Sequence, residues 1–202
     1  MRVLVPFDAR APKTRLSPLL TDDERRDFAT AMCRDVLRAL DGHEVTLVAT
    51  TAVDAPVPVE VDDRPLSAAV NARLAGETAV VMADLALATP ESIDRLFATA
   101  GDVVAAPGRG GGTNALVVRH PEFATDYHGV SFRDHRRAAR AVGADFRTVD
   151  SFRLASDIDE PSDLADLLLH GTGAARDYLV ERGIELGVRD GRAVAVREGE
   201  SF

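Results

Sequence analysis

The sequence is short of cysteine and of long apolar runs, and each shortage excludes a class of structure. A single cysteine, Cys33, can form neither an internal disulfide framework nor a multi-cysteine metal site. Cys33 falls on the apolar face of a predicted helix, which favours a small buried side chain over a reactive thiol. No apolar run approaches the ~20 residues that span a bilayer, and MRVLVPFDAR lacks the pattern of a secretory signal. We therefore expect a cytoplasmic protein without a membrane partner.

Acidic residues outnumber basic residues, 33 against 24. The formal net charge is -9, whereas nonspecific nucleic-acid binding needs a basic surface, so we expect no nucleic-acid partner. Lysine is almost absent, because Lys13 is the only lysine among the 24 lysine and arginine residues. Many acids with almost no lysine indicate either adaptation to salt or a GC-rich genome. The one lysine lies in the loop after the first predicted strand, which makes it the leading candidate for a functional cation.

Apolar strands and amphipathic helices alternate along almost the whole chain. The predicted strands are Arg2–Pro6, Val45–Thr50, Val57–Val61, Ala79–Ala83, Asp102–Pro107, Ala115–Arg119 and Asp145–Val149. The predicted helices follow the capping boxes at Thr21 and Thr89 or cover Leu66–Leu74, Ser131–Val142, Pro161–His170 and Arg176–Arg182. This alternation predicts one α/β domain over residues 1–202, with three α/β/α layers and a mostly parallel sheet.

The C-terminal region breaks the alternation. Ile184–Val188 and Ala193–Arg197 flank Asp190-Gly191, a dipeptide typical of a type I′ hairpin turn. We expect this hairpin to be an appendage that protects a sheet edge or contacts another subunit.

Ligands of open α/β sheets bind at the carboxyl ends of the strands, where the first candidate group lies. Arg10, Lys13 and Arg15 follow the first strand, and three cations in six residues can bind a triphosphate. The P-loop pattern is absent, and a solvated basic loop is the alternative.

Carboxylates form the second candidate group. Asp84 follows the most apolar strand, and Asp159 stands at a turn before a helix. Mg²⁺ binds carboxylate oxygens together with substrate phosphates, so these residues are candidate metal ligands. Asp157 is a weaker candidate, and Asp163 in the first helical turn is expected to be structural. The alternative for Asp84 is an ordinary cap or turn.

A glycine-rich loop forms the third candidate group. Gly110, Gly111 and Gly112 can bring backbone N–H groups close to an anion, and Thr113 and Asn114 add polar donors. A flexible connector is the alternative. Ser131 can cap a helix, bind a phosphate, or do both. The histidines lack zinc-ligand spacing, and the G-x-S-x-G and G-x-G-x-x-G patterns are absent, which disfavours zinc, serine-hydrolase and dinucleotide chemistry.

Five segments together resemble the 2-phospho-L-lactate guanylyltransferases, a branch of the MobA-like nucleotidyltransferases known from archaea. These segments are VPFDARAPKTRLSPLL, VVMADLAL, PGRGGGTNAL, YHGVSFRDH and DIDEPSDLADLLLHGTGAARDYL. They span nearly the whole chain in the family's order. The resemblance implies a nucleotide-diphospho-sugar transferase (GT-A-like) fold, a homodimer and Mg²⁺ as cofactor.

The resemblance also implies an activity and a distribution of roles. The enzyme would transfer GMP from GTP to 2-phospho-L-lactate, giving lactyl-2-diphospho-5′-guanosine and pyrophosphate for coenzyme F-420 biosynthesis. By position, Asp84 and Asp159 match the metal pair, and Lys13 and Arg15 match the triphosphate loop. Thr113, Gly129 and Ser131 match the phospho-acid site.

Three alternative functions stay open on sequence grounds. Phosphoenolpyruvate could replace 2-phospho-L-lactate, as in some relatives. Another nucleotidyltransferase, using CTP or a sugar phosphate, would have the same fold and metal pair. A non-catalytic nucleotide-binding protein is disfavoured by the presence of both acids.

Overall fold

The structure is a computed structural model that describes residues 1–10 and 12–199. Seven strands form one sheet in the order β3-β2-β1-β4-β6-β5-β7. The strands are β1 (Arg2–Phe7), β2 (Glu44–Ala49), β3 (Val59–Val61), β4 (Thr78–Val81), β5 (Val103–Pro107), β6 (Thr113–Val118) and β7 (Phe146–Thr148). Only β6 runs antiparallel to its neighbours β4 and β5, so the prediction of a mostly parallel sheet is confirmed.

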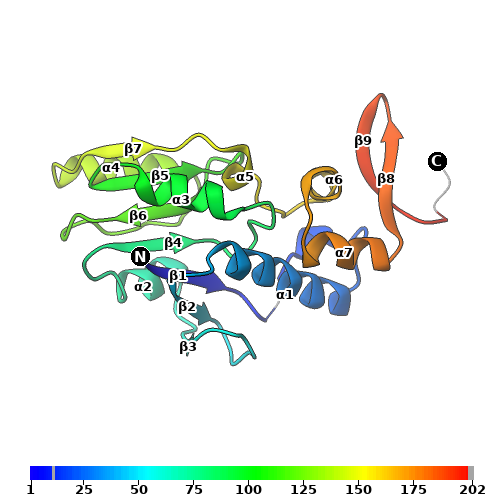
Figure 1. The fold of residues 1–202 in the computed structure, drawn as a ribbon, viewed down its shortest axis with the longest axis horizontal. Coiled ribbons are helices and arrows are strands. Elements are labelled where there is room, and N and C mark those ends of the chain that lie inside the picture. The colour runs from blue at the N-terminus through cyan, green and yellow to red at the C-terminus, as the bar shows by residue number, and fades with distance from the viewer. Residues whose placement is uncertain (11, 200–202) are drawn as a thin grey trace.

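Helices cover both faces of this sheet, which makes three layers (Figure 1). The larger core lies under α1 (Asp22–Ala39), α3 (Pro90–Ala98), α5 (Phe152–Ala155), α6 (Pro161–His170) and α7 (Ala174–Glu181). The smaller core lies under α2 (Leu66–Asn71) and α4 (Ser131–Ala141). The four central strands β1, β4, β6 and β5 are almost wholly buried because apolar side chains are packed on both sides.

Local sequence signals explain where most helices begin. The Thr21 hydroxyl accepts the backbone N–H of Glu24, and the Glu24 carboxylate accepts the N–H of Thr21, as the capping box predicts. Thr89 caps α3 in the same way, with Pro90 in its first turn. Cys33 is buried in α1, and burial raises the pKa of its thiol to about 12, which confirms a packing role.

Two short elements were not predicted, and the start of β6 is among several element ends that differ from the prediction. A 3₁₀ turn, η1 (Thr14–Leu16), lies in the first loop, and α5 precedes the acidic segment. Strand β6 begins at Thr113 rather than Ala115, and its register with β5 shifts at this point. Ala106 pairs with Ala115 but Pro107 pairs with Thr113, so Asn114 is the extra residue of a β-bulge.

The C-terminal hairpin stands apart from the main sheet, at the end of the molecule that carries α6 and α7 (Figure 1). It consists of β8 (Ile184–Arg189) and β9 (Arg192–Arg197). Asp190 and Gly191 have φ values of 52° and 73°, as a type I′ turn requires. Because β8 and β9 form a sheet of their own, the hairpin does not protect an edge of the seven-stranded sheet.

Candidate active site

The carboxyl ends of β1, β4 and β5 lie at one edge of the sheet, and the candidate residues meet there. The antiparallel direction of β6 places its first residue, Thr113, at this same edge. The acidic segment reaches the edge through a backbone hydrogen bond from Ile158 N–H to the carbonyl of Asp84, with 3.3 Å between nitrogen and oxygen. Residues more than a hundred positions apart therefore share one site.

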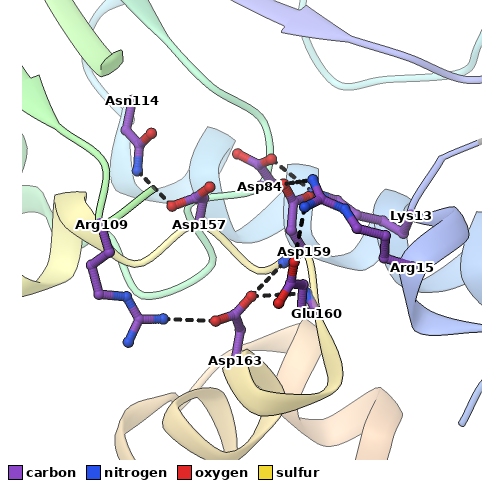
Figure 2. Close-up of polar contacts among 9 residues, drawn as sticks. All are labelled: Lys13, Arg15, Asp84, Arg109, Asn114, Asp157, Asp159, Glu160 and Asp163. Carbon is purple, nitrogen blue, oxygen red and sulfur yellow. Dashed lines mark hydrogen bonds and ion pairs between the residues drawn. The ribbon is translucent and has the colours of Figure 1, made fainter. Parts of the chain in front are cut away.

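Lys13 lies between the carboxylates of Asp84 and Asp159 (Figure 2). Its Nζ is 2.7 Å from Asp84 Oδ2 and 2.5 Å from Asp159 Oδ1. Burial alone lowers the pKa of Lys13, but the two carboxylates outweigh it, and the net pKa is raised. The predicted meeting of these three residues is therefore present, with the ammonium group charged and held by both acids.

The backbone at Lys13 adopts the left-handed conformation, with φ 57° and ψ 40°. This conformation causes steric strain in a residue with a Cβ, and no side chain among the described residues caps η1 there. The unusual backbone directs the side chain towards the sheet edge, where its carboxylate partners offset the cost.

Arg15 reaches Asp159 and its neighbour Glu160 from the solvent side. Its guanidinium lies 3.0 Å from Asp159 Oδ2 and 2.9 Å from Glu160 Oε1. Sequence reasoning did not single out Glu160, although an acid next to a candidate ligand is a signal that could have found it. Both oxygens of Asp159 are thus engaged by cations.

Asp163 is structural, as predicted. Its Oδ2 accepts the backbone N–H groups of Asp159 and Glu160, at 3.0 and 2.8 Å, which fixes the turn that presents Asp159. Its Oδ1 also accepts from Arg109, so the glycine-rich loop and the start of α6 are tied together (Figure 2). Arg109 is therefore paired with acids of α6 and does not point into open solvent.

One carboxylate oxygen of Asp84 has no partner among the described residues. Asp84 Oδ1 is buried and makes no hydrogen bond within residues 1–10 and 12–199. Asp157 lies beside it and accepts one hydrogen bond from Asn114 Nδ2, at 3.0 Å. Burial, together with the nearby charges of Asp84 and Asp159, raises the pKa of Asp157. Asp84, Asp157 and Asp159 form the acidic centre of this site.

The Asn114 side chain forms its hydrogen bonds with protein groups in this structure. Its amide also donates to the carbonyl of Leu154, at 3.0 Å, and its predicted contact with substrate stays a prediction. Gly108 packs directly against Asn114, since a Cβ on Gly108 would lie 2.4 Å from Asn114 Oδ1. The glycine-rich loop thus needs a glycine for close approach as well as for flexibility.

The residues predicted to hold the phospho-acid gather at the start of α4. Ser131 Oγ accepts the backbone N–H of Thr113, at 3.0 Å, so Ser131 joins β6 to α4 and does not cap the helix. The loop residue Gly111 has φ 85° and contacts Val130, next to Gly129. Gly110 and Gly112 border the same space as Asp157 and Asp159.

Three adjoining hollows form a groove along the sheet edge. The central one is lined by residues that include Lys13, Asp84 and Asp159. The second shares Pro6, Phe7, Asp8 and Met82 with it and extends over β2 and α2. The third shares Asp159 and reaches the glycine-rich loop. The second and third hollows therefore adjoin the central one through shared lining residues.

The part of the chain that the structure describes contains neither a preformed three-residue metal cage nor a membrane-spanning helix. Within the described ranges, no group of three or more His, Cys, Asp or Glu side chains is arranged to hold a metal ion. Nor does any helix there combine the length and apolarity that crossing a membrane demands.

Comparison with known proteins agrees with the sequence resemblance. Residues 1–198 match the family described as "Guanylyl transferase CofC like". A 2-phospho-L-lactate guanylyltransferase from Halomicrobium mukohataei is 59% identical over 202 residues, covering 98% of this chain and 100% of the relative. One from Haloferax volcanii is 58% identical over 204 residues, covering 98% and 99%.

A solved structure supports the fold. A nucleotide-diphospho-sugar transferase from Desulfovibrio desulfuricans superposes with a TM-score of 0.69 at 13% identity, covering 90% of this chain and 96% of that one. The predicted fold class is thereby confirmed. On the family match and the two full-length relatives, the chain belongs to the CofC-like guanylyl transferase family.

Proposed function

We propose that this enzyme transfers GMP from GTP to 2-phospho-L-lactate. The products would be lactyl-2-diphospho-5′-guanosine and pyrophosphate, in coenzyme F-420 biosynthesis. The names of relatives at 58–59% identity over nearly the full chain support this substrate pair. The observation that carries the proposal is the convergence of Asp84, Asp159 and Lys13 in a groove at the carboxyl edge of the sheet.

The reaction needs charge neutralisation rather than a protein base. The phosphate oxygen of the acceptor is already anionic, attacks the α-phosphorus of GTP and displaces pyrophosphate through cleavage of the α–β bridge. Two anions must be brought into line, so catalysis depends on positioning and on positive charge. Lys13 and Arg15 would stabilise the leaving pyrophosphate, since both side chains border the groove.

The donor set fits Mg²⁺ as cofactor. Asp84 and Asp159 would hold it, with Asp157 as a weaker candidate. The buried Asp84 Oδ1, which has no hydrogen-bond partner among the described residues, is an available ligand. Mg²⁺ commonly uses one or two carboxylates with substrate phosphates, so a cage of three protein ligands is not required. When bound, Mg²⁺ would supply Lewis-acid stabilisation of phosphate charge. Lys13 now neutralises the same two acids, and a divalent cation would compete with it for their oxygens.

The anionic acceptor and the phosphates of GTP would be bound by Thr113, Gly129, Ser131 and the backbone amides of Gly110–Gly112. Asn114 would act indirectly, by holding Asp157 in place through its hydrogen bond.

Pyrophosphate release provides the direct test. Each of the four ribonucleoside triphosphates is combined with 2-phospho-L-lactate, with phosphoenolpyruvate, or with buffer. We expect release only with GTP and 2-phospho-L-lactate. Release only with phosphoenolpyruvate would change the acceptor, release only with CTP would overturn the guanylyl assignment, and no release would favour a non-catalytic nucleotide-binding protein.

Asp84→Asn tests the acidic centre. We expect turnover to fall by roughly two orders of magnitude, because one electrostatic partner of the transferring group is lost. Near-normal turnover of this variant at saturating Mg²⁺ would remove Asp84 from the mechanism.

A homodimer and a cytoplasmic location belong to the same proposal. Exposed apolar side chains on and beside the hairpin support an interface between two copies: Leu169, Val180, Leu186 and Val188. Light scattering of the purified chain tests this, and a monomer at micromolar concentration would contradict it.

A further inference from the structure

His135 is fully buried on α4, next to the proposed acceptor site. Its ring packs edge-on against Tyr127, with ring centres 4.8 Å apart, and also contacts Phe123. Both ring nitrogens have partners. Nε2 lies 3.0 Å from the backbone nitrogen of Asp126, and Nδ1 lies 2.8 Å from Thr113 Oγ1.

These two contacts determine the tautomer of the imidazole. The backbone N–H of Asp126 can only donate, so Nε2 must be the bare, accepting nitrogen. The proton of a neutral ring is therefore on Nδ1, and it is donated to Thr113 Oγ1. Burial lowers the pKa of His135 to about 4, against the opposing charges of Asp126 and Asp134, which agrees with a neutral ring.

The tautomer in turn orients the Thr113 hydroxyl. Because Oγ1 accepts from His135, its own proton must point elsewhere. Across residues 1–10 and 12–199, that proton finds no protein acceptor. The Ser131 hydroxyl is similar: its Oγ accepts the backbone N–H of Thr113, and its own proton has no acceptor within that part of the chain. Two adjacent hydroxyls are thus left with protons to donate and with oxygens already engaged.

We propose that His135 is a positioning residue that holds the Thr113 hydroxyl as a hydrogen-bond donor to the anionic acceptor. The role of the acceptor rests on the function proposed above. An anion is bound by donors, and a freely rotating hydroxyl would lose rotational entropy on binding or turn its oxygen to the anion. His135 removes that choice before the ligand arrives, without itself touching substrate.

The tautomer is tested on the resting protein, without substrate. Long-range ¹⁵N–¹H correlation of the histidine rings separates the two neutral tautomers from the charged ring. We expect His135 to show a protonated Nδ1 and a bare Nε2 at neutral pH. A protonated Nε2, or a charged ring, would overturn the proposal. This measurement requires no variant, so it does not depend on whether a substituted chain folds.

Kinetics test the consequence. In His135→Leu we expect the KM for 2-phospho-L-lactate to rise about 10-fold, with the KM for GTP unchanged, because an oriented hydrogen bond to a charged group is lost. His135→Asn should recover most of this, since its amide nitrogen can replace Nδ1 as donor. Adding His135→Leu to Thr113→Val should cause no further loss, because the hydroxyl is already absent.

The exposed His170 provides the matched control, and His170→Leu should leave both KM values unchanged. An equal rise in both KM values, or additive losses in the double variant, would reduce His135 to a packing residue. A wild-type chain that transfers to no acceptor would overturn the proposed function. An active wild type with an unaffected His135→Leu would overturn only the role of His135.

Discussion

Replacing Lys13 with methionine tests the acidic centre without removing an acid. Lys13→Met leaves Asp84 and Asp159 without their shared cation. The Lys13 side chain is only 10% exposed, and the two carboxylates are 26% and 29% exposed. Exposed ion pairs contribute about 0–1 kcal/mol to stability, and breaking a buried ion pair costs about 3–5 kcal/mol. Because these groups are partly buried, we expect Lys13→Met to lower the free energy of unfolding by about 2 kcal/mol. For a chain of this length that corresponds to a Tm lower by about 4–8 °C.

The assay is thermal and urea unfolding, followed by circular dichroism in buffer containing a chelator. Arg15→Met is the control, because Arg15 pairs with the same Asp159 but is 63% exposed and should cost less than about 1 kcal/mol. Mg²⁺ should restore part of the stability of Lys13→Met but not its turnover. Equal stability of Lys13→Met and the wild type would refute the view that the ammonium neutralises two otherwise repelling carboxylates.

Three further predictions follow from other contacts. The unfolded imidazole binds a proton near pH 6.5, whereas folded His135 binds one only near pH 4. Lowering the pH from 6.5 to 4 should therefore reduce the free energy of unfolding of the wild type by up to about 3 kcal/mol. Urea unfolding at a series of pH values tests this, and His135→Asn should show a smaller loss of stability over that range. Gly108→Ala should lower the free energy of unfolding by about 1–3 kcal/mol, because the new Cβ would collide with Asn114. Gly110→Ala is the control: the space around Gly110 is open, so its stability in the same assay should be nearly unchanged. Asp35→Ala should cost about 1–2 kcal/mol in urea unfolding, because its carboxylate accepts the first two N–H groups of α7, and an unchanged midpoint would contradict this.

The alternation of apolar periods determined the fold class and most element positions. α6 was predicted at Pro161–His170 and has those bounds, because a proline at its start and a regular apolar face are local signals. The short α5 and η1 were not predicted, since elements of three or four residues carry too little periodicity. The antiparallel direction of β6 also escaped prediction, because the pattern of a buried strand is the same in either direction.

The candidate site divides in the same way. Residue type and position after a strand were enough to select Lys13, Arg15 and Asp84, because strand ends in such sheets share one edge. Asp159 was selected from its place at a turn before a helix. Tertiary structure alone decided how they pair: one ammonium group shared by two acids from different loops. The contact between Thr113 and His135 depends on the β-bulge at Asn114, which turns Thr113 towards α4 and Asn114 towards α5. Hydrophobic periodicity and composition determine whether a segment becomes a helix or a strand. Bulges, strand direction and long-range pairing depend on contacts with segments that are distant in the sequence.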